Sequence, residues 1–451
     1  MSKTIRLNKG LDIKLKGKAE KVFTKGQLAK SYAVKPTDFP GLTPKVTVKV
    51  GDEVKAGTTL FTDKYQQDVC FASPVSGIVS EVRRGDRRKL LEVVVEPSEE
   101  QIFETFEVGD VTTMSREAIL SVILKSGAFP FFIQRPYGTV ANPNDKPRDI
   151  FISGFDTAPL APDMDFALTG EAEAFQHGVN VLRKLTEGKV YLSLPTEMSA
   201  TSIMRNVKGV EMHTFSGAHP AGNVGIQIHH IAPINKGDVV WTIAPYHIVS
   251  LGRLFSKGIY DVSRLVAVTG SKVKKQTYVK NFAGAALSSY NDYFHSGDDV
   301  RYISGNVLTG TRLELNGHMG FHHNQLTVIP EGDYFEFVGW AKPFRTKKFS
   351  VSHAYFSWLM PNKEYSLDTN LNGGHRTLVM TGQYEKVLPM DILPTYLLKA
   401  IIAEDIDRME QLGIYEVVEE DLALCEFICP SKTDVQQIIR NGLELLRKEM
   451  C

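Results

Sequence analysis

The sequence predicts a multidomain chain of mixed α/β and α+β class, because its pattern changes three times. Residues 1–101 alternate apolar and polar side chains in short runs, which is typical of half-buried strands. Residues 102–255 alternate strand-like and helix-like segments, which indicates βαβ units around a parallel sheet. Residues 256–330 return to strand signals, and residues 331–451 form a linker followed by amphipathic helices. We therefore expect four domains.

The composition is that of an ordinary globular protein. Apolar residues make up 43% of the 451 residues, which excludes wholesale disorder. Lys and Arg together number 52, as do Asp and Glu, so a nucleic-acid partner is not expected. The four cysteines are too few for a disulfide framework. We expect neither a signal peptide nor a membrane-spanning helix, and infer a chain that faces a reducing cytosol.

The first domain is expected to be a small β structure. Strands are predicted at 45–50, 76–82 and 90–97, with a basic turn at 83–88. The motifs VGDEVKAGTTLFTDK and ASPVSGIV follow the turn order of a biotinyl/lipoyl carrier domain. Such a carrier presents its modified lysine at an exposed hairpin tip, and Lys64 is the candidate for that position. The alternative is a barrel-like sandwich that keeps this shape without the modification.

The second domain has the clearest alternation of helices and strands. Ser115 is a suitable N-cap for a helix that ends before Gly127 and Pro130. The most regular helix is predicted at 171–186, with acidic residues in its first turn and Gly188 after its end. The other elements are strands at 149–156, 189–195 and 209–215 and a short helix at 199–206. This order predicts a Rossmann-like domain with a parallel sheet.

The third domain is predicted to be a small β-grasp (ubiquitin-like) fold. Its strand signals lie at 264–273, 298–310 and 324–332, with one helix near 282–294. The following residues, 331–390, are rich in aromatic residues and turns and are interpreted as a linker.

The chain is expected to end in a helical domain. After Pro394, apolar residues recur at helical spacing and predict a helix with a buried stripe, formed by Leu397, Leu398, Ile401 and Ile402. Thr433 and Gln436 have the spacing of a capping box before the final helix.

Two cysteines near the C-terminus match part of an iron–sulfur motif. Bacterial ferredoxin clusters use C-x2-C-x2-C-x3-C-P, and Cys425-x3-Cys429-Pro430 matches its last third. The two earlier ligand positions fall on Leu422 and Glu419, which supply no thiolate. Two sulfurs do not hold a cubane cluster. We therefore expect two small buried apolar side chains that are the remnant of a cluster site.

Four of the twelve histidines lie in one short segment, 212–233. His213, His219, His229 and His230 match no common zinc spacing, and no metal site is predicted. Histidines flanked by glycines commonly anchor a turn or an interface. The functional alternative is that they donate hydrogen bonds or protons to a redox ligand such as a quinone.

An aromatic loop follows the first helix of the second domain. In a Rossmann-like domain, ligands bind in the crevice at the strand ends. The flat rings and the single guanidinium of this loop suit a planar ligand with a polar edge, and the structural alternative is a hydrophobic plug. The candidate quinone contacts in this loop are Phe129, Phe131, Phe132, Arg135 and Tyr137.

Taken together, these motifs resemble the A subunit of the bacterial sodium-translocating NADH:quinone oxidoreductase. The further matching stretches are FSGAHPAGNVGIQIHHIAP, NQLTVIPEG with FEFVGWAKP, and the long segment from QYEKVLPMDILP to LCEFICPSK. The resemblance implies a peripheral subunit on the cytoplasmic face of the bacterial inner membrane, bound to an integral-membrane subunit of the pump. That pump passes electrons from NADH to ubiquinone and exports Na⁺, and its A subunit is assigned to the quinone-reducing end.

This family has two relatives, the C subunit of the Rnf complex and the flavin subunit of complex I. Both hold flavin with a Gly-Gly-Ala-x-Phe-Pro type loop. Here the corresponding stretch is Ser126–Pro130, with one glycine. Their acidic Asn-x-Glu-Cys-Glu-Pro type segment corresponds to residues 153–159, where Asp156 is the only acid. We therefore expect no FMN and no iron–sulfur cluster, with ubiquinone as a candidate substrate.

Two classes of function follow from these motifs. The first is a cofactor-free docking and quinone-handling subunit of the pump, which is not catalytic when isolated. The second is a carrier-like soluble metabolic enzyme or a flavin-binding NADH oxidoreductase subunit. The absence of a G-x-G-x-x-G motif disfavours a stand-alone NADH flavoenzyme.

Overall fold

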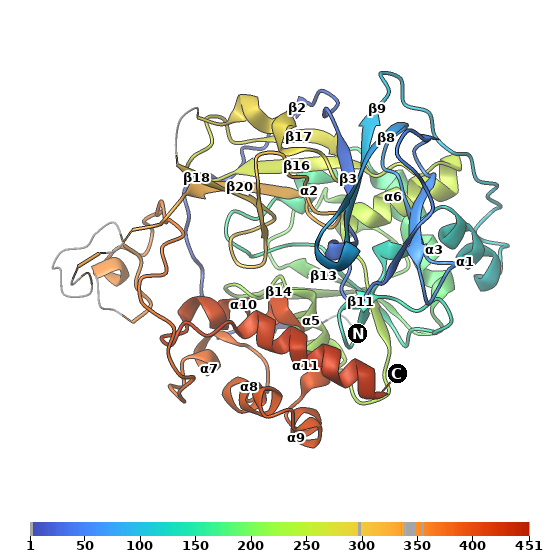
Figure 1. Ribbon diagram of the computed structural model, residues 1–451. Coiled ribbons are helices and arrows are strands. Elements are labelled where there is room, and N and C mark those ends of the chain that lie inside the picture. The colour runs from blue at the N-terminus through green and yellow to red at the C-terminus, as the bar shows by residue number, and fades with distance from the viewer. Residues whose placement is uncertain are drawn as a thin grey trace.

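The computed structural model describes most of the chain, in the ranges 3–295, 299–334, 336–337, 339, 348–352 and 356–450. Within these ranges the chain forms four sheets, with a group of helices at its C-terminal end (Figure 1). The predicted mixed class is confirmed. Of the matching stretch FEFVGWAKP, most residues lie outside the described ranges, as does Cys451.

The first domain is a sandwich of two small sheets. One sheet has the order β3 (Tyr32–Val34), β9 (Leu90–Pro97), β8 (Gly77–Arg84), β5 (Glu53–Val54), and the other β4 (Pro44–Val46), β6 (Thr59–Asp63), β7 (Cys70–Ala72). The strands predicted at 76–82 and 90–97 are confirmed as the β8–β9 hairpin. Its tip contains the short helix η2 (Asp86–Arg88).

The first two strands of the chain lie outside this sandwich. β1 (Thr4–Arg6) pairs in parallel with β14 (Glu211–Ser216), and β2 (Phe23–Lys25) pairs in parallel with β17 (Thr277–Phe282). The predicted boundary at residue 101 therefore does not separate the sheets from one another. A strand of three residues has no readable period, and its partner is more than two hundred residues away, so sequence pattern does not reveal such a pairing.

The second domain is built on a seven-stranded sheet. Its order is β1, β14, β13 (Val190–Pro195), β12 (Ile150–Ser153), β15 (Val240–Thr242), β10 (Ile133–Arg135), β11 (Thr139–Val140). β12 to β15 are parallel, so the predicted parallel sheet is confirmed. If β12, β13, β14 and β15 are numbered 1 to 4 in chain order, their order across the sheet is 3-2-1-4. This is the arrangement of a doubly wound sheet. β10 and β11 extend the sheet as antiparallel strands.

Both faces of this sheet are buried because successive side chains of a strand point to opposite sides. Ile150 and Ile152 lie in one core with α1, α3, α4 and α6, whereas Phe151 between them lies in a second core with α5 and the C-terminal helices. The helices of this domain are α1 (Arg116–Lys125), α2 (Met164–Ala167), α3 (Ala172–Leu185), α4 (Ile203–Asn206), α5 (Val224–Ile231) and α6 (Pro245–Lys257). The Ser115 hydroxyl accepts a hydrogen bond from the Ala118 amide, which confirms the predicted N-cap of α1.

The third sheet has six strands, in the order β19 (Thr311–Leu313), β18 (Val300–Ser304), β20 (Gln325–Pro330), β16 (Ser263–Thr269), β17, β2. β17 is not among the strands that the sequence pattern predicts. The helix predicted near 282–294 is the 3-10 helix η4 (Leu287–Tyr293), which buries only Leu287 and Tyr290. Figure 1 shows this sheet above the second domain, next to the sandwich.

The C-terminal helices cover the second core of the seven-stranded sheet (Figure 1). They are α7 (Tyr384–Val387), α8 (Pro394–Ile402), α9 (Ile406–Gln411), α10 (Glu419–Ile428) and α11 (Val435–Met450). Three residues of the predicted stripe on α8 are buried, but Ile402 is 59% exposed because it is the last residue of the helix. At the start of α11, the Gln436 amide donates its hydrogen bond to Glu426 Oε2 of α10 at 2.9 Å and not to Thr433, as the predicted capping box requires.

Among the described residues, no helix combines the length and the apolar composition that a membrane span requires.

Two glycines let α3 and α6 approach one another closely. A Cβ atom on Gly252 of α6 would lie 1.7 Å from the Ala174 carbonyl oxygen, and one on Gly178 of α3 would lie 2.2 Å from the Ile248 carbonyl oxygen. Real Cβ atoms do not approach backbone oxygens so closely, so any larger residue must push the helices apart.

We predict that Gly252→Ala destabilises the protein by about 1–3 kcal/mol, the usual cost of overpacking, although alanine favours a helix. Urea unfolding of the full chain measures this change. The matched control is Gly374→Ala, because no atom lies within 4 Å of the added Cβ. Equal stability of the two variants would contradict the close helix contact.

Candidate functional site

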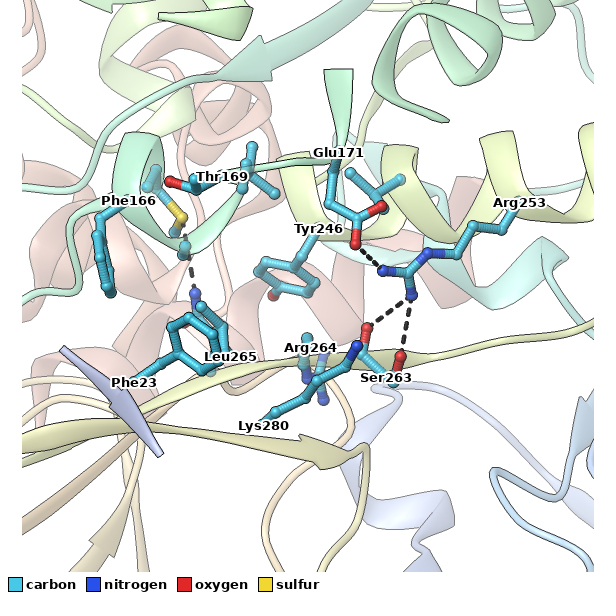
Figure 2. Close-up of a pocket in the computed structure, with 15 residues that line it drawn as sticks. Phe23, Phe166, Thr169, Glu171, Tyr246, Arg253, Ser263, Arg264, Leu265 and Lys280 are labelled. Atoms are coloured by element: carbon cyan, nitrogen blue, oxygen red, sulfur yellow. Dashed lines mark hydrogen bonds and ion pairs between the residues drawn. The ribbon is translucent and has the colours of Figure 1, made fainter. Parts of the chain in front are cut away.

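A pocket of about 180 Å³ lies between the second domain and the six-stranded sheet (Figure 2). One wall comes from the segment before α3 and from the first half of α6, which follow the carboxyl ends of β12 and β15. The other wall comes from β2, β16 and β17. β12 and β15 are neighbours at the position where the strand order reverses, and such positions are the usual ligand sites of α/β sheets. Position alone therefore makes this pocket a candidate site.

An arginine of α6 closes one end of the pocket. Arg253 Nη1 donates hydrogen bonds to the Ser263 carbonyl oxygen at 2.9 Å and to the Ser263 hydroxyl at 3.0 Å. The same guanidinium pairs with Glu171 (Figure 2). It also lies 3.3 Å from Asp261. Its charge is thus balanced by two carboxylates. These contacts hold α6 against the first residue of β16.

A second buried arginine, Arg264 of β16, has no ion pair with a carboxylate among the described residues, although the charge of Asp38 acts to raise its pKa. Its Nη2 donates to the Phe321 carbonyl oxygen at 2.6 Å, and its Cζ lies 4.9 Å from the ring centre of Tyr246. The residue is 8% exposed, and its Nε has no hydrogen-bond partner among the described residues. Burial lowers the pKa of this guanidinium.

Behind Tyr246 lies a layer of aromatic rings in which three domains meet. We call it the aromatic junction; it consists of Phe39, Phe131, His247, Phe321 and His322. Phe131 and His247 stack with ring centres 4.3 Å apart, and Phe39 and Phe321 lie 5.2 Å apart. The two histidines are 3.2 Å apart, Nε2 to Nδ1. Burial lowers the pKa of His322 to about 3 and that of His247 well below its usual value, so both rings are neutral.

The aromatic loop of the second domain is part of the protein core. Phe129 and Phe132 pack against Trp241, and all three rings are completely buried. Phe131 belongs to the aromatic junction. A Cβ on Gly127 would lie 2.5 Å from the Ala72 Cβ, so the sandwich domain covers the start of this loop. The loop thus has the arrangement of a hydrophobic plug, the structural alternative to a ligand site.

Arg135, at the end of β10, joins the second domain to α10. It is 2% exposed, and its guanidinium lies 2.8 Å from Asp421 Oδ2 and 2.5 Å from Glu420 Oε1. Asp421 Oδ2 also accepts a hydrogen bond from the Val418 amide. Tyr137 follows in the same region, where its carbonyl oxygen accepts a hydrogen bond from Arg440 of α11 at 2.9 Å. Arg135 and Tyr137 therefore contact the C-terminal helices.

The four clustered histidines do not form one group: His213 and His219 have separate contacts, whereas the rings of His229 and His230 lie side by side, 5.1 Å apart. His213 of β14 accepts a hydrogen bond from the Lys3 amide, and His219 Nδ1 lies 3.1 Å from the Thr157 hydroxyl. Both are buried, and burial lowers the pKa of both, that of His219 to about 4.

The other two histidines lie on α5 and hold the C-terminal helices. His229 Nδ1 is 2.7 Å from Glu416 Oε2, and its Nε2 accepts a hydrogen bond from the Asp391 amide. His230 Nε2 is 2.9 Å from the Pro389 carbonyl oxygen. The contacts of these histidines therefore anchor turns and the interface between α5 and the C-terminal helices. Quinone binding by the nine candidate residues stays a prediction. Among the described residues, no three His, Cys, Asp or Glu side chains are grouped for a metal.

Both cysteines of the partial cluster motif are buried in the helical core. Cys425 lies on α10, and burial raises the pKa of its thiol. Cys429 directly follows α10, and its sulfur accepts a hydrogen bond from the Tyr384 hydroxyl at 2.9 Å. Burial acts to raise the pKa of Cys429, but this hydrogen bond and one from the Thr433 amide outweigh it and lower the pKa.

Lys64 lies exposed in the connection between β6 and β7, where a carrier domain would present its lysine. The pocket residues Arg253, Arg264 and Tyr246 are not among the site residues that the sequence predicts. The sequence offers one partial signal, because an arginine within the otherwise apolar strand 264–268 is unusual. Its partners Tyr246 and Phe321, however, come from two other segments of the chain.

Comparison with known proteins places this architecture in a defined class. Models of the NqrA N-terminal barrel-sandwich hybrid domain, the NqrA second alpha/beta domain and the NQRA C-terminal domain match residues 5–98, 114–260 and 265–314. The chain is thus a protein of the NqrA class, with these domains in succession. Among solved structures, a chain of an NAD⁺-reducing [NiFe]-hydrogenase has a TM-score of 0.40 and 13% identity, over 77% of this chain and 67% of that chain.

Curated relatives specify the family. The A subunit of the Na(+)-translocating NADH-quinone reductase from Yersinia pestis bv. Antiqua is 36% identical, and that from Vibrio anguillarum is 37% identical. The protein of the same name from Cellvibrio japonicus is 36% identical. Each comparison covers 99% of this chain and 100% of the relative. The chain belongs to the family of Na⁺-translocating NADH–quinone reductase A subunits, which are components of an oxidoreductase complex, and the predicted family is confirmed.

The neutral buried histidines predict an acid-sensitive fold. His219, His322 and His323 have pKa values of about 4, 3 and 3, below the usual 6.5, because of burial. As the pH falls below 6.5, the unfolded chain takes up protons that the folded chain does not. The free energy of unfolding should therefore fall by about 1.4 kcal/mol per pH unit for each histidine.

Urea unfolding between pH 7.5 and 5.5 measures this dependence. His219→Asn should reduce the slope by the share of one histidine. His177→Asn, a change on the exposed face of α3, should leave it unchanged. The same slope in both variants would show that His219 is not held neutral.

Proposed function

We propose that this chain is a peripheral subunit on the cytoplasmic face of the bacterial inner membrane, at the quinone-reducing end of a Na⁺-pumping NADH:ubiquinone reductase. It binds an integral-membrane subunit and carries no redox cofactor of its own. We further propose that its domains descend from a lipoyl-carrier-like, a Rossmann-like and a β-grasp ancestor. The observation that carries the proposal is the filling, by protein side chains, of the loop where related proteins hold flavin.

The residues of this loop do not fit a flavin. A backbone that cradles a phosphate needs exposed amide groups and no side chains in the way. Here Phe129, Phe131 and Phe132 occupy the space, and Gly127 faces Ala72 of the sandwich. Asp156 of the acidic segment accepts a hydrogen bond from the Ala158 amide within its own turn at 2.7 Å. We therefore derive no electron-transfer step through this chain.

The residues of the partial cluster motif do not fit an iron–sulfur cluster either. Cys425 and Cys429 supply two sulfurs where a cubane needs four ligands. Leu422 is buried in the helical core, and Glu419 is paired with Arg440. The motif thus serves the packing of α10 against α7 and α11.

Docking on a partner subunit is supported by apolar side chains on the outer face of α8. Leu393 and Tyr396 are about half exposed, as is Ile402 at the helix end, while the inner face of the helix is already buried. A helix that is apolar on both faces is typical of a covered position. Membership in a multisubunit complex supplies partners of this kind.

Direct quinone contact is proposed at the aromatic loop 129–137. Tyr137 is only partly buried, whereas the phenylalanines of this loop are fully buried. A quinone would reach Tyr137 first, next to the Arg135 ion pair. The clustered histidines are the second proposed location, because His229 and His230 are also partly exposed.

The purified chain should be colourless. We expect no visible flavin absorbance, no iron, and an intact mass equal to that of the 50.2 kDa polypeptide. A biotin or lipoate adduct on Lys64 would instead support the carrier function, for which the exposed position of this lysine is the favourable observation. A stoichiometric flavin or iron content would overturn the cofactor-free assignment.

In the assembled pump, Tyr137→Asn should raise the KM for a short-tail quinone several-fold and leave the KM for NADH unchanged. Asparagine is chosen because Tyr137 has a φ of 83°, which asparagine tolerates. The control is Tyr65→Asn, which removes an exposed tyrosine of the sandwich domain. Unchanged quinone kinetics in the Tyr137 variant would remove the loop from the quinone path.

A further inference from the structure

Three polar side chains from two domains form a cluster that is separate from the pocket and from the aromatic junction. Ser31 directly precedes β3 and Glu92 lies on β9, both in the sandwich domain, whereas His318 lies before β20 in the third domain. The Ser31 hydroxyl oxygen is 2.9 Å from His318 Nε2, and His318 Nδ1 is 3.1 Å from Glu92 Oε2. A serine, an imidazole and a carboxylate in this order are a nucleophile, its base and the group that orients the base. We call these residues the serine cluster.

The fold of the sandwich places the serine and the carboxylate on one side of a sheet. β3 and β9 are neighbouring antiparallel strands, and Ser31 and Glu92 each lie two residues before a member of one facing pair. Residues two apart on a strand point to the same face, so both side chains face the third domain. The third domain is held there by its backbone, because the Ala286 amide donates a hydrogen bond to the Ser31 carbonyl oxygen at 3.0 Å, and Ala286 bridges to His318.

The carboxylate determines which nitrogen of the imidazole carries the proton. Burial acts to raise the pKa of Glu92, but the hydrogen bonds and charges of His318 and Arg83 outweigh it and lower the pKa. An ionised carboxylate only accepts hydrogen bonds, so His318 Nδ1 is the donor in this contact. The neutral ring then has its lone pair on Nε2, which faces the Ser31 hydroxyl. The Ser31 hydroxyl therefore donates to Nε2, as a nucleophile does to its general base.

Only the serine of this cluster is open to solvent. Ser31 is partly exposed, whereas His318 is 2% exposed and Glu92 is 8% exposed. A small molecule can thus reach the hydroxyl, while the base behind it is shielded from water. The Lys30 and Ser31 backbone amides make no hydrogen bond within the described part of the chain. They are donors next to the hydroxyl, where negative charge develops when a serine attacks a carbonyl group.

We infer that Ser31 is a nucleophile for acyl transfer from small carboxylic esters, with His318 as its general base and Glu92 as the residue that positions the base. The Ser31 oxygen forms a bond to the ester carbonyl carbon, and the hydroxyl proton passes to His318 Nε2. The bond to the leaving alcohol then breaks, and the alcohol departs with that proton. Water attacks the acyl-serine in the same way, which releases the carboxylic acid and restores the hydroxyl. None of these residues belongs to the proposed quinone loop, so the two proposals are independent.

The first test uses the full chain and phenylmethylsulfonyl fluoride. In this reaction the Ser31 oxygen bonds to sulfur, fluoride leaves, and the proton passes to His318. General-base catalysis contributes about 10²–10⁴-fold, so peptide mass spectrometry should show Ser31 labelled at least ten times faster than Ser98. Ser98 is the matched control, an exposed serine of the same domain whose hydroxyl has no partner among the described residues. Equal labelling of the two serines would show that the cluster only joins the domains and would overturn the inference.

The second test follows the hydrolysis of p-nitrophenyl acetate. Ser31→Ala should lose the activity and Ser98→Ala should retain it. Glu92→Gln replaces the carboxylate by an amide that can donate to Nδ1, and should slow hydrolysis at least ten-fold, whereas Glu92→Asp keeps the charge and should recover part of the rate. Activity that survives in both Ser31→Ala and Glu92→Gln would rule out the serine cluster. Should a buried variant fail to fold, the labelling of Ser31 against Ser98 in the unchanged chain still decides.

Discussion

The aromatic junction is the contact on which the arrangement of the domains depends, because Phe321 meets Phe39 of the sandwich and Phe131 of the second domain. Phe131 comes from the loop after α1 and His247 from the first turn of α6, and Phe321 of the third domain and Phe39 of the sandwich complete the layer. Aromatic pairs contribute about 0.5–1.5 kcal/mol each beyond their buried area. Because three domains share one layer, none of them can move without exposing rings of the other two.

This layer also occupies the part of the α/β scaffold that commonly takes a ligand. The crevice beyond the strand ends is where an α/β sheet holds its ligand. Side chains from three domains fill that space here, and burial keeps His247 and His322 neutral within it. What is left is the smaller pocket on the other side of Tyr246.

A second link, the ion pair of Arg135 with Asp421, sets the position of the C-terminal helices. Its burial makes it costly to form, and an apolar contact of the same size would provide more stability. Its geometry is specific, however, because Asp421 also accepts the Val418 amide and lies against Gly225 of α5, where a Cβ would meet its carboxylate. The two histidines of α5 add hydrogen bonds to the same interface. These contacts fix the orientation of the helical group on the sheet.

The local elements and the family could be predicted from the order of the residues alone. The hairpin β8–β9, the helices α1 and α3 and the parallel strands β12–β14 were predictable because period and capping are properties of neighbouring residues. The missing thiolates beside Cys425 and Cys429 were equally plain. Which side chains meet became known only from the folded chain. Three features depend on contacts between distant segments: the pairing of β1 with β14, the different partners of His219 and His229, and the pocket between the second domain and the six-stranded sheet. Such contacts leave no periodic signal in a single sequence.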